Sequence, residues 1–414
     1  QIRQGKVPEG YKKEKLGIVP EEWNETSFST LFTSTSDYTD DLDKYPLYSL
    51  TIEDGITPKT ERYERSHLVK KEDSYKIVRP NDYAYNPMNL RFGAVARHKG
   101  NMPVAVSGYY DIFTTVHESD LPFMDSFLTC GPMITYYNRV STGSLVEKQR
   151  VHFSQFLEFV LPLPSINERA KIAAILTTQN KIIELKEKRL AQKQRQKKYL
   201  MQQLLTGKKR LLEFSEEWKI KPLKKLTEKQ KKKNDGFQYR LVLSNSAQHG
   251  IVSQDQEFDK EIANEERIDG YYIVIPGAFV YNPRISVTAP CGPINVNETG
   301  ETGIMSPLYT VFTISSPQIS QDFLKYYFQS SCWYKYVKGV ANYGARHDRI
   351  SISDGDFFDM PIPLPTKEEQ NYIAKVLSAA DREIELLQQD IEQEKQKKKA
   401  LMQLLLTGIV RVNV

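Results

Sequence analysis

Two loops of this 414-residue chain combine arginine, lysine, asparagine and aromatic side chains, the groups with which proteins commonly read DNA. The first loop is Asn89-Leu-Arg-Phe-Gly-Ala-Val-Ala-Arg-His-Lys99, and the second is Asn342-Tyr-Gly-Ala-Arg-His-Asp-Arg349. Arginine can donate two hydrogen bonds to guanine, asparagine can pair with the edge of adenine, and lysine can hold a phosphate. Surface loops often carry these residues, so the pattern by itself indicates nucleic-acid binding only weakly.

A Tyr-Asn-Pro sequence occurs once in each half of the chain, at Tyr85–Pro87 and at Tyr281–Pro283. Asn-Pro is typical of a turn, and we expect the same strand-end turn in both halves. Residues near these turns and in the two loops form the set expected to contact DNA. The set is Tyr85, Asn86, Asn89, Arg91, Arg97, His98, Lys99, Arg150, Tyr281, Asn282, Arg284, Asn342, Tyr343, Arg346, His347 and Arg349.

The motifs do not favour an enzyme. Both Tyr-Asn-Pro sequences lack the second proline and the aromatic residue of the Asn-Pro-Pro-aromatic motif of adenine-N6 methyltransferases. The chain has no glycine-rich nucleotide fingerprint and no P-loop, and its histidines show no metal-ligand spacing. Glu184-Leu-Lys186 is similar to part of a nuclease signature, but no aspartate is in register, so we interpret it as a solvated helix face. The sequence therefore predicts no catalytic residue, metal site or cofactor in this chain.

The elements that must position these loops come from a duplication. Leu-Met-Gln-Gln-Leu-Leu-Thr-Gly ends at Gly207, and the same stretch with one difference ends at Gly408, at an offset of 201 residues. Outside this segment the match is looser, because Trp23 recurs as Trp218 at an offset of 195, and Tyr85 as Tyr281 at 196. A period this long is not that of a solenoid repeat, so whole domains are duplicated.

The best-matched part of each copy predicts a helix of about 40 residues, or ~60 Å. Ser165-x-x-Glu168 and Thr366-x-x-Glu369 are capping boxes, in which the hydroxyl accepts from an amide at the helix start and the glutamate reaches back to the cap amide. Gly207 supplies a left-handed stop after the first helix, as its counterpart does after the second.

Apolar residues in both helices alternate at spacings of four and three, which is a heptad seam. The seam residues are Ile172, Leu176, Ile183, Leu190, Leu200 and Leu204 in the first helix, and Ile373, Leu377, Ile384, Leu387, Ile391, Leu401 and Leu405 in the second. Because the seams match in length, we expect the helices of one chain to pair antiparallel, the basic first helix against a neutral second one. A homodimeric coiled coil is the alternative.

The segments before the helices are predicted to be mixed α/β domains, with short strands such as Tyr75–Val78 and Gly270–Ile275 separated by turns. The expected fold is therefore α/β (α+β): two domains joined by an antiparallel coiled coil, with an internal pseudo-two-fold repeat. The boundaries are 1–160 for the first domain with its N-terminal tail, 161–211 for the first helix, 212–360 for the second domain and 361–414 for the second helix.

The bulk composition fits a cytoplasmic protein. Cysteines are few and odd in number, at three, which argues for reduced thiols. No apolar run approaches the ~20 residues of a membrane span. The net charge of +5 is a weak sign of an anionic partner.

The ordered double set of motifs resembles the specificity subunit of type I restriction-modification systems, over nearly the whole chain. Its carriers are Glu-Glu-Trp, Tyr-Asn-Pro, Leu-Pro before each helix and Leu-Leu-Thr-Gly with a nearby arginine after it. They are Pro20–Trp23, Glu216–Trp218, Tyr85–Pro87, Tyr281–Pro283, Leu161–Ser165, Pro361–Thr366, Leu204–Arg210 and Leu405–Arg411.

This resemblance implies two target-recognition domains that each read half of a bipartite double-stranded DNA site. It implies that the helices hold the halves apart and dock two methyltransferase subunits, with restriction subunits joining for cleavage. S-adenosylmethionine, ATP and magnesium would then act on those partner subunits and not on this chain. Two alternatives stay open: a specificity subunit of a fused, type IIB-like restriction-methylation enzyme, and, more distantly, a coiled-coil scaffold with peptide-binding heads.

Overall fold

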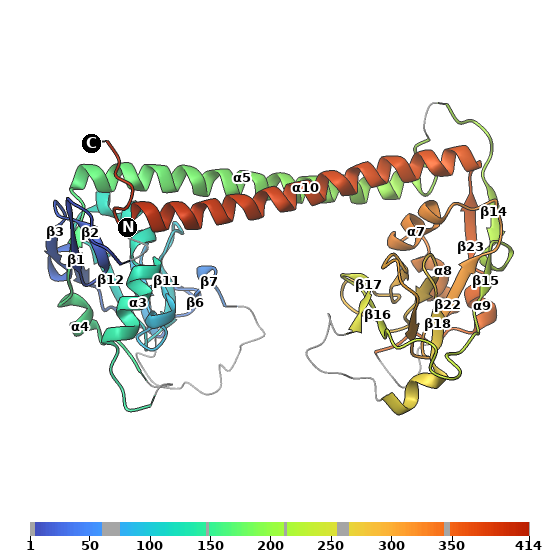
Figure 1. Cartoon of the computed structure of the whole chain (residues 1–414), viewed down its shortest axis with the longest axis horizontal. Helices are drawn as coiled ribbons and strands as arrows, with labels where there is room; N and C mark the ends of the chain where they lie inside the picture. The colour runs from blue at the N-terminus through green and yellow to red at the C-terminus, as the bar shows by residue number, and fades with distance from the viewer. Residues whose placement is uncertain are drawn as a thin grey trace. The chain divides into compact units, whose positions relative to one another are not determined.

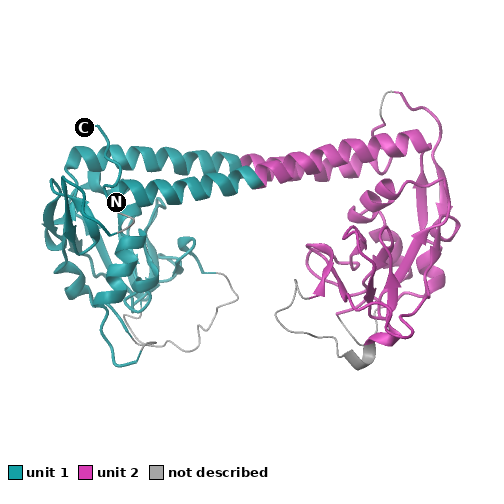
Figure 2. Cartoon of the chain, viewed as in Figure 1, with its two compact units in different colours: residues 1–187, 389–414 teal, residues 188–388 magenta. Residues whose placement is uncertain are grey.

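The computed structural model describes residues 5–59, 75–145, 149–210, 213–254, 265–342 and 348–413. The chain divides into two compact units (Figure 2). Unit 1 comprises Gln1–Glu187 with Gln389–Val414, and unit 2 comprises Lys188–Gln388. Both ends of the chain thus belong to unit 1, and each unit contains part of both long helices (Figure 1).

The elements follow one another in largely the same order in the two units. In unit 1 they are β1 (Tyr11–Glu14), β2 (Gly17–Pro20), β3 (Asn24–Ser27), α1 (Phe28–Leu31), β4 (Phe32–Ser34), β5 (Tyr38–Thr39), β6 (Tyr48–Thr51), β7 (Gly55–Pro58), β8 (Tyr75–Val78), β9 (Tyr83–Tyr85), η4 (Leu90–Phe92), β10 (Val95–Arg97), β11 (Val104–Ser107), β12 (Asp111–Thr115), η5 (Glu118–Asp120), α2 (Leu121–Phe127), α3 (Gly131–Val140), α4 (Phe153–Leu157) and β13 (Val160–Leu163). In unit 2 they are β14 (Lys219–Pro222), η7 (Leu223–Lys225), β15 (Thr227–Lys229), β16 (Leu243–Ser246), β17 (Gly250–Ser253), η8 (Glu265–Gly270), β18 (Tyr272–Val274), β19 (Phe279–Tyr281), β20 (Ile294–Val296), β21 (Gly303–Met305), β22 (Thr310–Ile314), α7 (Gln321–Gln329), α8 (Tyr334–Val340), α9 (Asp354–Phe358) and β23 (Pro361–Leu364). Most elements of unit 2 thus have a counterpart in unit 1, and unit 1 also has the β1–β2 hairpin and β5.

The central sheet has the same topology in both units. In unit 1 the strand order is β10-β9-β12-β4, and in unit 2 it is β20-β19-β22-β15, with antiparallel neighbours throughout. Two-stranded pairs also recur, since β13 pairs with β3 just as β23 pairs with β14. The duplication inferred from short motifs therefore extends to strand order in the divergent domains.

Each sheet packs against the following helices through stacked aromatic rings. The ring of Tyr85 stacks on Phe156 at 5.5 Å between centroids in unit 1, and Tyr281 stacks on Phe357 at 4.9 Å in unit 2. All four residues are buried. Such pairs add ~0.5–1.5 kcal/mol to the burial of their area. The motif tyrosine thus belongs to the core of its unit.

Two helices of 39 residues each follow the domains, α5 (Ile166–Leu204) and α10 (Lys367–Leu405). The amide of Glu168 donates to the Ser165 hydroxyl at 3.2 Å, and the amide of Glu369 donates to the Thr366 hydroxyl at 3.2 Å. Gly207 and its counterpart at 408 have a φ of 69°, the left-handed geometry that favours glycine. The predicted start and stop signals are confirmed.

The helices run antiparallel within each unit. In unit 1, Gln179 contacts Glu394 and Lys186 contacts Asp390, so residue numbers rise on one helix as they fall on the other. In unit 2, Lys193 pairs with Glu383 in the same sense. Every seam residue named above is buried or half-buried. The predicted antiparallel coiled coil is confirmed, and the apolar stripes that a homodimeric coiled coil would need are covered within the chain.

The capping glutamates do not complete their capping boxes, which corrects the sequence interpretation. The Glu168 carboxylate accepts from Trp23 Nε1 at 3.3 Å and from Arg411 Nε at 2.7 Å and Nη2 at 3.1 Å. Its side chain is only 2 % exposed. A guanidinium fork satisfies a buried carboxylate better than a single cap amide would, because both oxygens receive charge-assisted hydrogen bonds.

Unit 2 contains the same arrangement. The Glu369 carboxylate accepts from Trp218 Nε1 at 3.0 Å and from Arg210 at 3.0 and 2.6 Å. We call each trio a Trp–Glu–Arg clasp. In both units the arginine comes from the end of the helix that belongs to the other sequence repeat, so each unit is closed by the other repeat's C-terminal motif.

Candidate nucleic-acid interface

The Tyr-Asn-Pro sequence forms the same strand-end turn in both units. Asn86 Oδ1 accepts from the Met88 amide at 3.0 Å after β9, and Asn282 Oδ1 accepts from the Arg284 amide at 3.0 Å after β19. These side-chain-to-backbone bonds are Asx turns, which asparagine favours because its short amide mimics a peptide group. The turn that the sequence predicts is therefore present twice, and it uses the side-chain oxygen of the asparagine.

The two motif tyrosines are wrongly included among the DNA-contacting residues. Tyr85 is fully buried and donates to the Val151 carbonyl at 2.8 Å, while Tyr281 is 2 % exposed and donates to the Cys291 carbonyl at 3.1 Å. Burial also raises the pKa of the Tyr85 hydroxyl well above its ordinary value. Both rings are needed in the core, and neither can reach a nucleic acid in the folded unit.

The turn positions a second loop beside it. In unit 1 the Val151 amide donates to the Pro87 carbonyl at 3.1 Å, and in unit 2 the Ile350 amide donates to the Pro283 carbonyl at 3.0 Å. Arg150 and Arg349 immediately precede these two amides. The structure therefore brings one arginine of a distant loop to each Tyr-Asn-Pro turn.

In unit 1 this arrangement gathers two arginines without a carboxylate partner in the described part of the chain. Arg91 Nη1 donates to Gln149 Oε1 at 3.2 Å, and its guanidinium lies 4.5 Å from the centroid of the Phe92 ring. The Phe92 side chain is half exposed, whereas the Arg91 Nε atom is itself buried and has no described acceptor. Arg150 is half-buried, and Asn89 is exposed. Uncompensated donors and an exposed ring are suited to base edges and phosphates.

The other basic residues of the first loop lie elsewhere. In the β9–β10 pair, Val95 faces Tyr85 and Arg97 faces Tyr83, so Arg97 lies at the opposite strand end from Asn86. The structure does not bring the two groups together. His98 is 3 % exposed with Nε2 at 2.8 Å from the Met102 carbonyl, so its inclusion as a DNA contact is wrong.

Arg97 is committed to an internal ion pair. Its Nε and Nη2 donate to the two oxygens of Asp125 at 2.9 and 2.8 Å, and Lys99 Nζ lies 3.2 Å from the same carboxylate. Burial would raise the pKa of the Asp125 carboxyl, but the hydrogen bonds and charges of these two cations outweigh it and the pKa is lowered. Arg97 thus stabilises the fold, whereas the side chain of Lys99 remains 66 % exposed.

Unit 2 places Arg284 and Arg349 together with a carboxylate between them. Their backbones form an isolated antiparallel bridge, and Asp348 lies 3.7 Å from Arg284 and 3.8 Å from Arg349. The two arginines, with Asn282 and Ser246, border a cavity of about 230 Å³. Here the two arginines are partly neutralised, in contrast to the first unit.

The remaining predicted residues of unit 2 are only partly described. Asn342 is exposed, and its backbone pairs with that of Ser351. Tyr343, Arg346 and His347 lie outside the described residues.

Sequence reasoning missed polar residues that adjoin both turns. Gln149 in unit 1 contacts Arg91, and in unit 2 the buried Asn245 accepts from Asn295 Nδ2 at 2.7 Å. The Ser-Asn-Ser sequence at 244–246 could have indicated these residues. One face of a strand is usually apolar and buried, so three consecutive polar residues are unusual there. These residues shape the surface around the arginines.

The interface offers hydrogen-bond donors from arginine side chains. No cluster of histidine, cysteine and carboxylate side chains in that part of the chain could hold a metal ion. Among the described helices, none is long and apolar enough to cross a membrane. The arrangement can bind an anionic, base-bearing polymer by complementary charge and hydrogen bonding.

Comparisons with known proteins show which family this chain is similar to. Residues 215–396 match the family model described as the type I restriction modification DNA specificity domain. The chain is 24 % identical, over 98 % of its length and 97 % of the relative's, to a putative type I restriction enzyme MjaX specificity subunit from Methanocaldococcus jannaschii. The chain is therefore similar to specificity subunits of type I restriction-modification systems, and the family model covers most of its second half.

Two further matches are a curated relative and a solved structure. The type I restriction enzyme MjaVIII specificity subunit of the same organism is 26 % identical over 62 % of this chain and 63 % of its own length. A solved structure from a study of assembly and conformational transition of a type I system matches with a TM-score of 0.56 at 14 % identity, and the match covers 95 % of this chain and 99 % of that one. The latter supports the two-domain, coiled-coil fold of this chain.

A specificity subunit is the non-catalytic DNA-recognition component of its system. Its partners are in general DNA and the modification and restriction subunits.

Proposed function

We propose that this chain is a specificity subunit that reads a bipartite DNA site, with one half-site contacted by each unit. The observation that carries the proposal is the pair of equivalent turns, each of which holds an arginine of a distant loop beside an arginine or amide of its own. Arg91 with Arg150, and Arg284 with Arg349, are the central pairs. Direct reading of bases needs donors held in place on a rigid frame, and the buried tyrosine and the Asx turn supply that frame.

The recognition domains would extend over 1–160 and 212–360, with the helices 161–211 and 361–414 between and after them. Asn86, Asn89, Asn282 and Asn342 would add contacts near the central arginines, and Lys99 would contact phosphate from the other strand end. We expect Tyr343, Arg346 and His347 to contribute in unit 2. The subunit would act in the cytoplasm, where the DNA that it reads is accessible.

We further propose that the paired helices dock two methyltransferase subunits, which restriction subunits join for cleavage. The support is the similarity to specificity subunits together with the outer faces of α5 and α10, which carry many charges and also exposed apolar side chains such as Leu185 and Leu386. S-adenosylmethionine, ATP and magnesium would bind those partners, and this chain would choose the sequence at which they act. A fused, type IIB-like partner would use the same recognition surface.

The test is DNA binding by the chain assembled with its methyltransferase, measured by fluorescence anisotropy at increasing salt. We expect affinity for random duplex to fall steeply with salt, because each neutralised phosphate releases a counterion. Replacing Arg91 and Arg150 together by alanine should reduce the slope and weaken binding, whereas Arg382→Ala, on the exposed face of α10, should not. Affinity that is independent of salt in the unaltered complex contradicts a DNA-reading role and favours a peptide-binding scaffold.

A further inference from the structure

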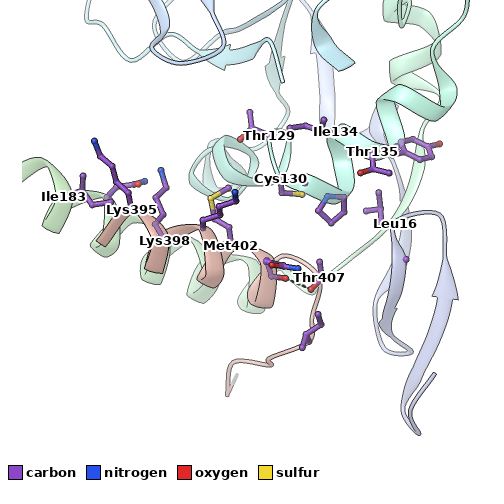
Figure 3. A pocket seen from close by; sticks show the side chains of 18 of the residues that line it. Leu16, Thr129, Cys130, Ile134, Thr135, Ile183, Lys395, Lys398, Met402 and Thr407 are labelled. Carbon is purple, nitrogen blue, oxygen red and sulfur yellow. Dashed lines mark hydrogen bonds between the residues drawn. The ribbon is translucent and has the colours of Figure 1, made fainter. Parts of the chain in front are cut away.

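Unit 1 contains a cavity of about 1140 Å³ between the coiled coil and the first recognition domain. Its walls come from the β1–β2 turn near Leu16, the start of α3 near Cys130 and the facing segments of α5 and α10. Figure 3 shows Lys398 and Met402 extending from α10 on the side that faces α3. The volume is at the upper end of small-ligand sites and would hold several side chains of a polypeptide.

The cavity has an apolar wall and an excess of positive charge. Ile134, Ile183 and Met402 contribute apolar surface, while five lysine or arginine side chains and two glutamates line the remainder. The excess is therefore three positive charges. A ligand that matches this lining must carry both an apolar group and at least one negative charge.

Lys398 is the least compensated of these cations. It is half-buried, and no described carboxylate lies within ion-pair distance of its ammonium group. Burial, and then the charge of Lys99, lower the pKa of Lys398. An ammonium group withdrawn from water without a partner is costly, so an anion supplied from outside would be strongly favoured there.

The equivalent position of unit 2 has an internal partner. Lys197 matches Lys398 at the helix offset of 201, and its ammonium group donates to the Asp381 carboxylate. Tyr326 donates to the other oxygen of the same carboxylate at 2.8 Å, and its ring lies 5.7 Å from the Lys197 ammonium. The lysine of unit 2 is therefore neutralised and covered by residues of its own unit.

Unit 1 lacks both of these groups. Asn180 stands at the position that matches Asp381, and it lines the cavity with Lys398. Helices α2 and α7 begin 200 residues apart, so Ser126 matches Tyr326 and no ring projects from α2 there. The cavity and the unpaired lysine have the same origin, which is the absence in unit 1 of a carboxylate and a tyrosine that unit 2 supplies.

We propose that this cavity receives an acidic segment of a partner polypeptide, with a carboxylate on Lys398 and a neighbouring apolar side chain against Ile134 and Met402. The inference rests on the proposed function, because the partner would be a methyltransferase subunit of the same complex. It goes further in one respect: the contact exists in unit 1 alone, so two identical methyltransferase subunits would not dock equivalently. A DNA phosphate would match the charge but not the apolar wall.

The test is zero-length carbodiimide cross-linking of the reconstituted complex, followed by peptide mass spectrometry. The reagent joins an amine to a carboxylate in contact, so we expect an amide between Lys398 and an aspartate or glutamate of the methyltransferase subunit. Lys197 serves as the internal control, because it should cross-link to Asp381 of its own chain. A cross-link from Lys197 to the partner with none from Lys398 overturns the proposal.

Titration calorimetry of the same complex supplies the second readout. Lys398→Gln should weaken one of the two methyltransferase sites by about tenfold or more, as expected when one member of a buried charged pair is removed. Asn180→Asp should weaken the same site without removing the lysine, because it rebuilds the internal pair of unit 2. Lys219→Gln, at an exposed lysine on β14 and outside both long helices, should leave both sites unchanged.

The outcomes separate this inference from the proposed function. If the complex forms with two sites and all three variants bind like the unaltered chain, the cavity is not a docking site although the subunit function stands. If duplex DNA alone protects Lys398 from acylation, the occupant is nucleic acid and the proposal is wrong. If the unaltered chain binds no methyltransferase subunit, the proposed function fails and this inference fails with it.

Discussion

The two units have the same frame but differ in the charges around it. Strand order, the stacked tyrosine and the clasp recur in both, although the domains have drifted from the helix offset of 201 to offsets of 195 and 196. By contrast, Arg91 and Arg150 have no described carboxylate partner, whereas Asp348 lies between Arg284 and Arg349. The features that recur are buried contacts that position loops. The features that differ are charged groups at the surface, partly or fully exposed, which could select a ligand.

This comparison shows what a duplicated domain must keep. The buried clasp glutamates, at 2 % and 1 % exposure, cannot lose their partners without leaving a charge in the interior. An exposed arginine can gain or lose a nearby carboxylate at little cost to stability. Two copies can therefore diverge in what they bind while they remain the same fold.

The largest expected effect is equal in both units. Leu176 and Leu377 are fully buried at matching seam positions. Replacing either by aspartate should destabilise its unit by about 3–5 kcal/mol, because a charge without a partner enters the seam. Urea unfolding measures the change. Leu185→Asp and Leu386→Asp are the matched controls, at exposed positions 54 % and 48 % accessible, and should cost little. A large loss in one unit only would show that the helices do not form one repeated seam.

Removing a clasp carboxylate should have the next largest effect. Glu168→Ala deletes the acceptor of three hydrogen bonds, two of them from a charged guanidinium, and should cost about 2–3 kcal/mol of unfolding free energy. Glu369→Ala should act in the same direction in unit 2. The exposed Glu217→Ala is the control. Thermal unfolding that is unchanged for both clasp variants would mean that the trio does not hold the termini of its unit.

A smaller effect should distinguish Arg91, which precedes β10, from Arg97 at the end of β10. Arg91→Ala should weaken DNA binding by about 1–2 kcal/mol with little change in stability, because its guanidinium has no carboxylate to lose. Arg97→Ala should do the reverse, lowering the unfolding free energy through loss of its bidentate pair with Asp125 while DNA affinity is retained. Anisotropy and urea unfolding on both variants provide the measurement. If both variants lost the same DNA affinity, Arg97 would also contact DNA.

The sequence predicted the helices and their pairing because those features depend on local spacing. Capping hydroxyls, glycine stops and a heptad seam are set by residues within a few positions of one another. It did not predict the burial of Tyr85, since a strand-end tyrosine is equally compatible with the core and the surface. It also did not separate Arg97 from Asn86, because hairpin register decides which end of a strand a residue reaches.

The sequence patterns did not predict the Trp–Glu–Arg clasps for a related reason. Glu168 is three residues from Ser165 and satisfies the capping-box pattern, but its actual partners lie at Trp23 and Arg411, far away in sequence. A pattern of spacing contains no information on which distant donors reach a carboxylate. The two copies offered one usable signal, since Trp, Glu and Arg recur together in both.

The smallest expected effect comes from exchanging the residue types at positions 180 and 381, which differ between the units. Asn180→Asp should give Lys398 an internal partner and raise the melting temperature slightly, and Asp381→Asn should lower it. Each change is worth about 0.5–1 kcal/mol, because the corresponding pair is partly exposed. Differential scanning calorimetry on the two variants and their combination checks this. Opposite signs would mean that a carboxylate at position 180 does not pair with Lys398 as Asp381 pairs with Lys197.

The central claim is that each unit reads its own half-site. Methylome sequencing of cells that carry the chain with its methyltransferase tests it most directly, by comparing the unaltered chain with the Arg91→Ala, Arg150→Ala double variant. The account predicts that one half-site becomes degenerate while the bases of the other half-site and the gap between them stay unchanged. Degeneracy in both half-sites, or no change in either while methylation persists, would contradict it.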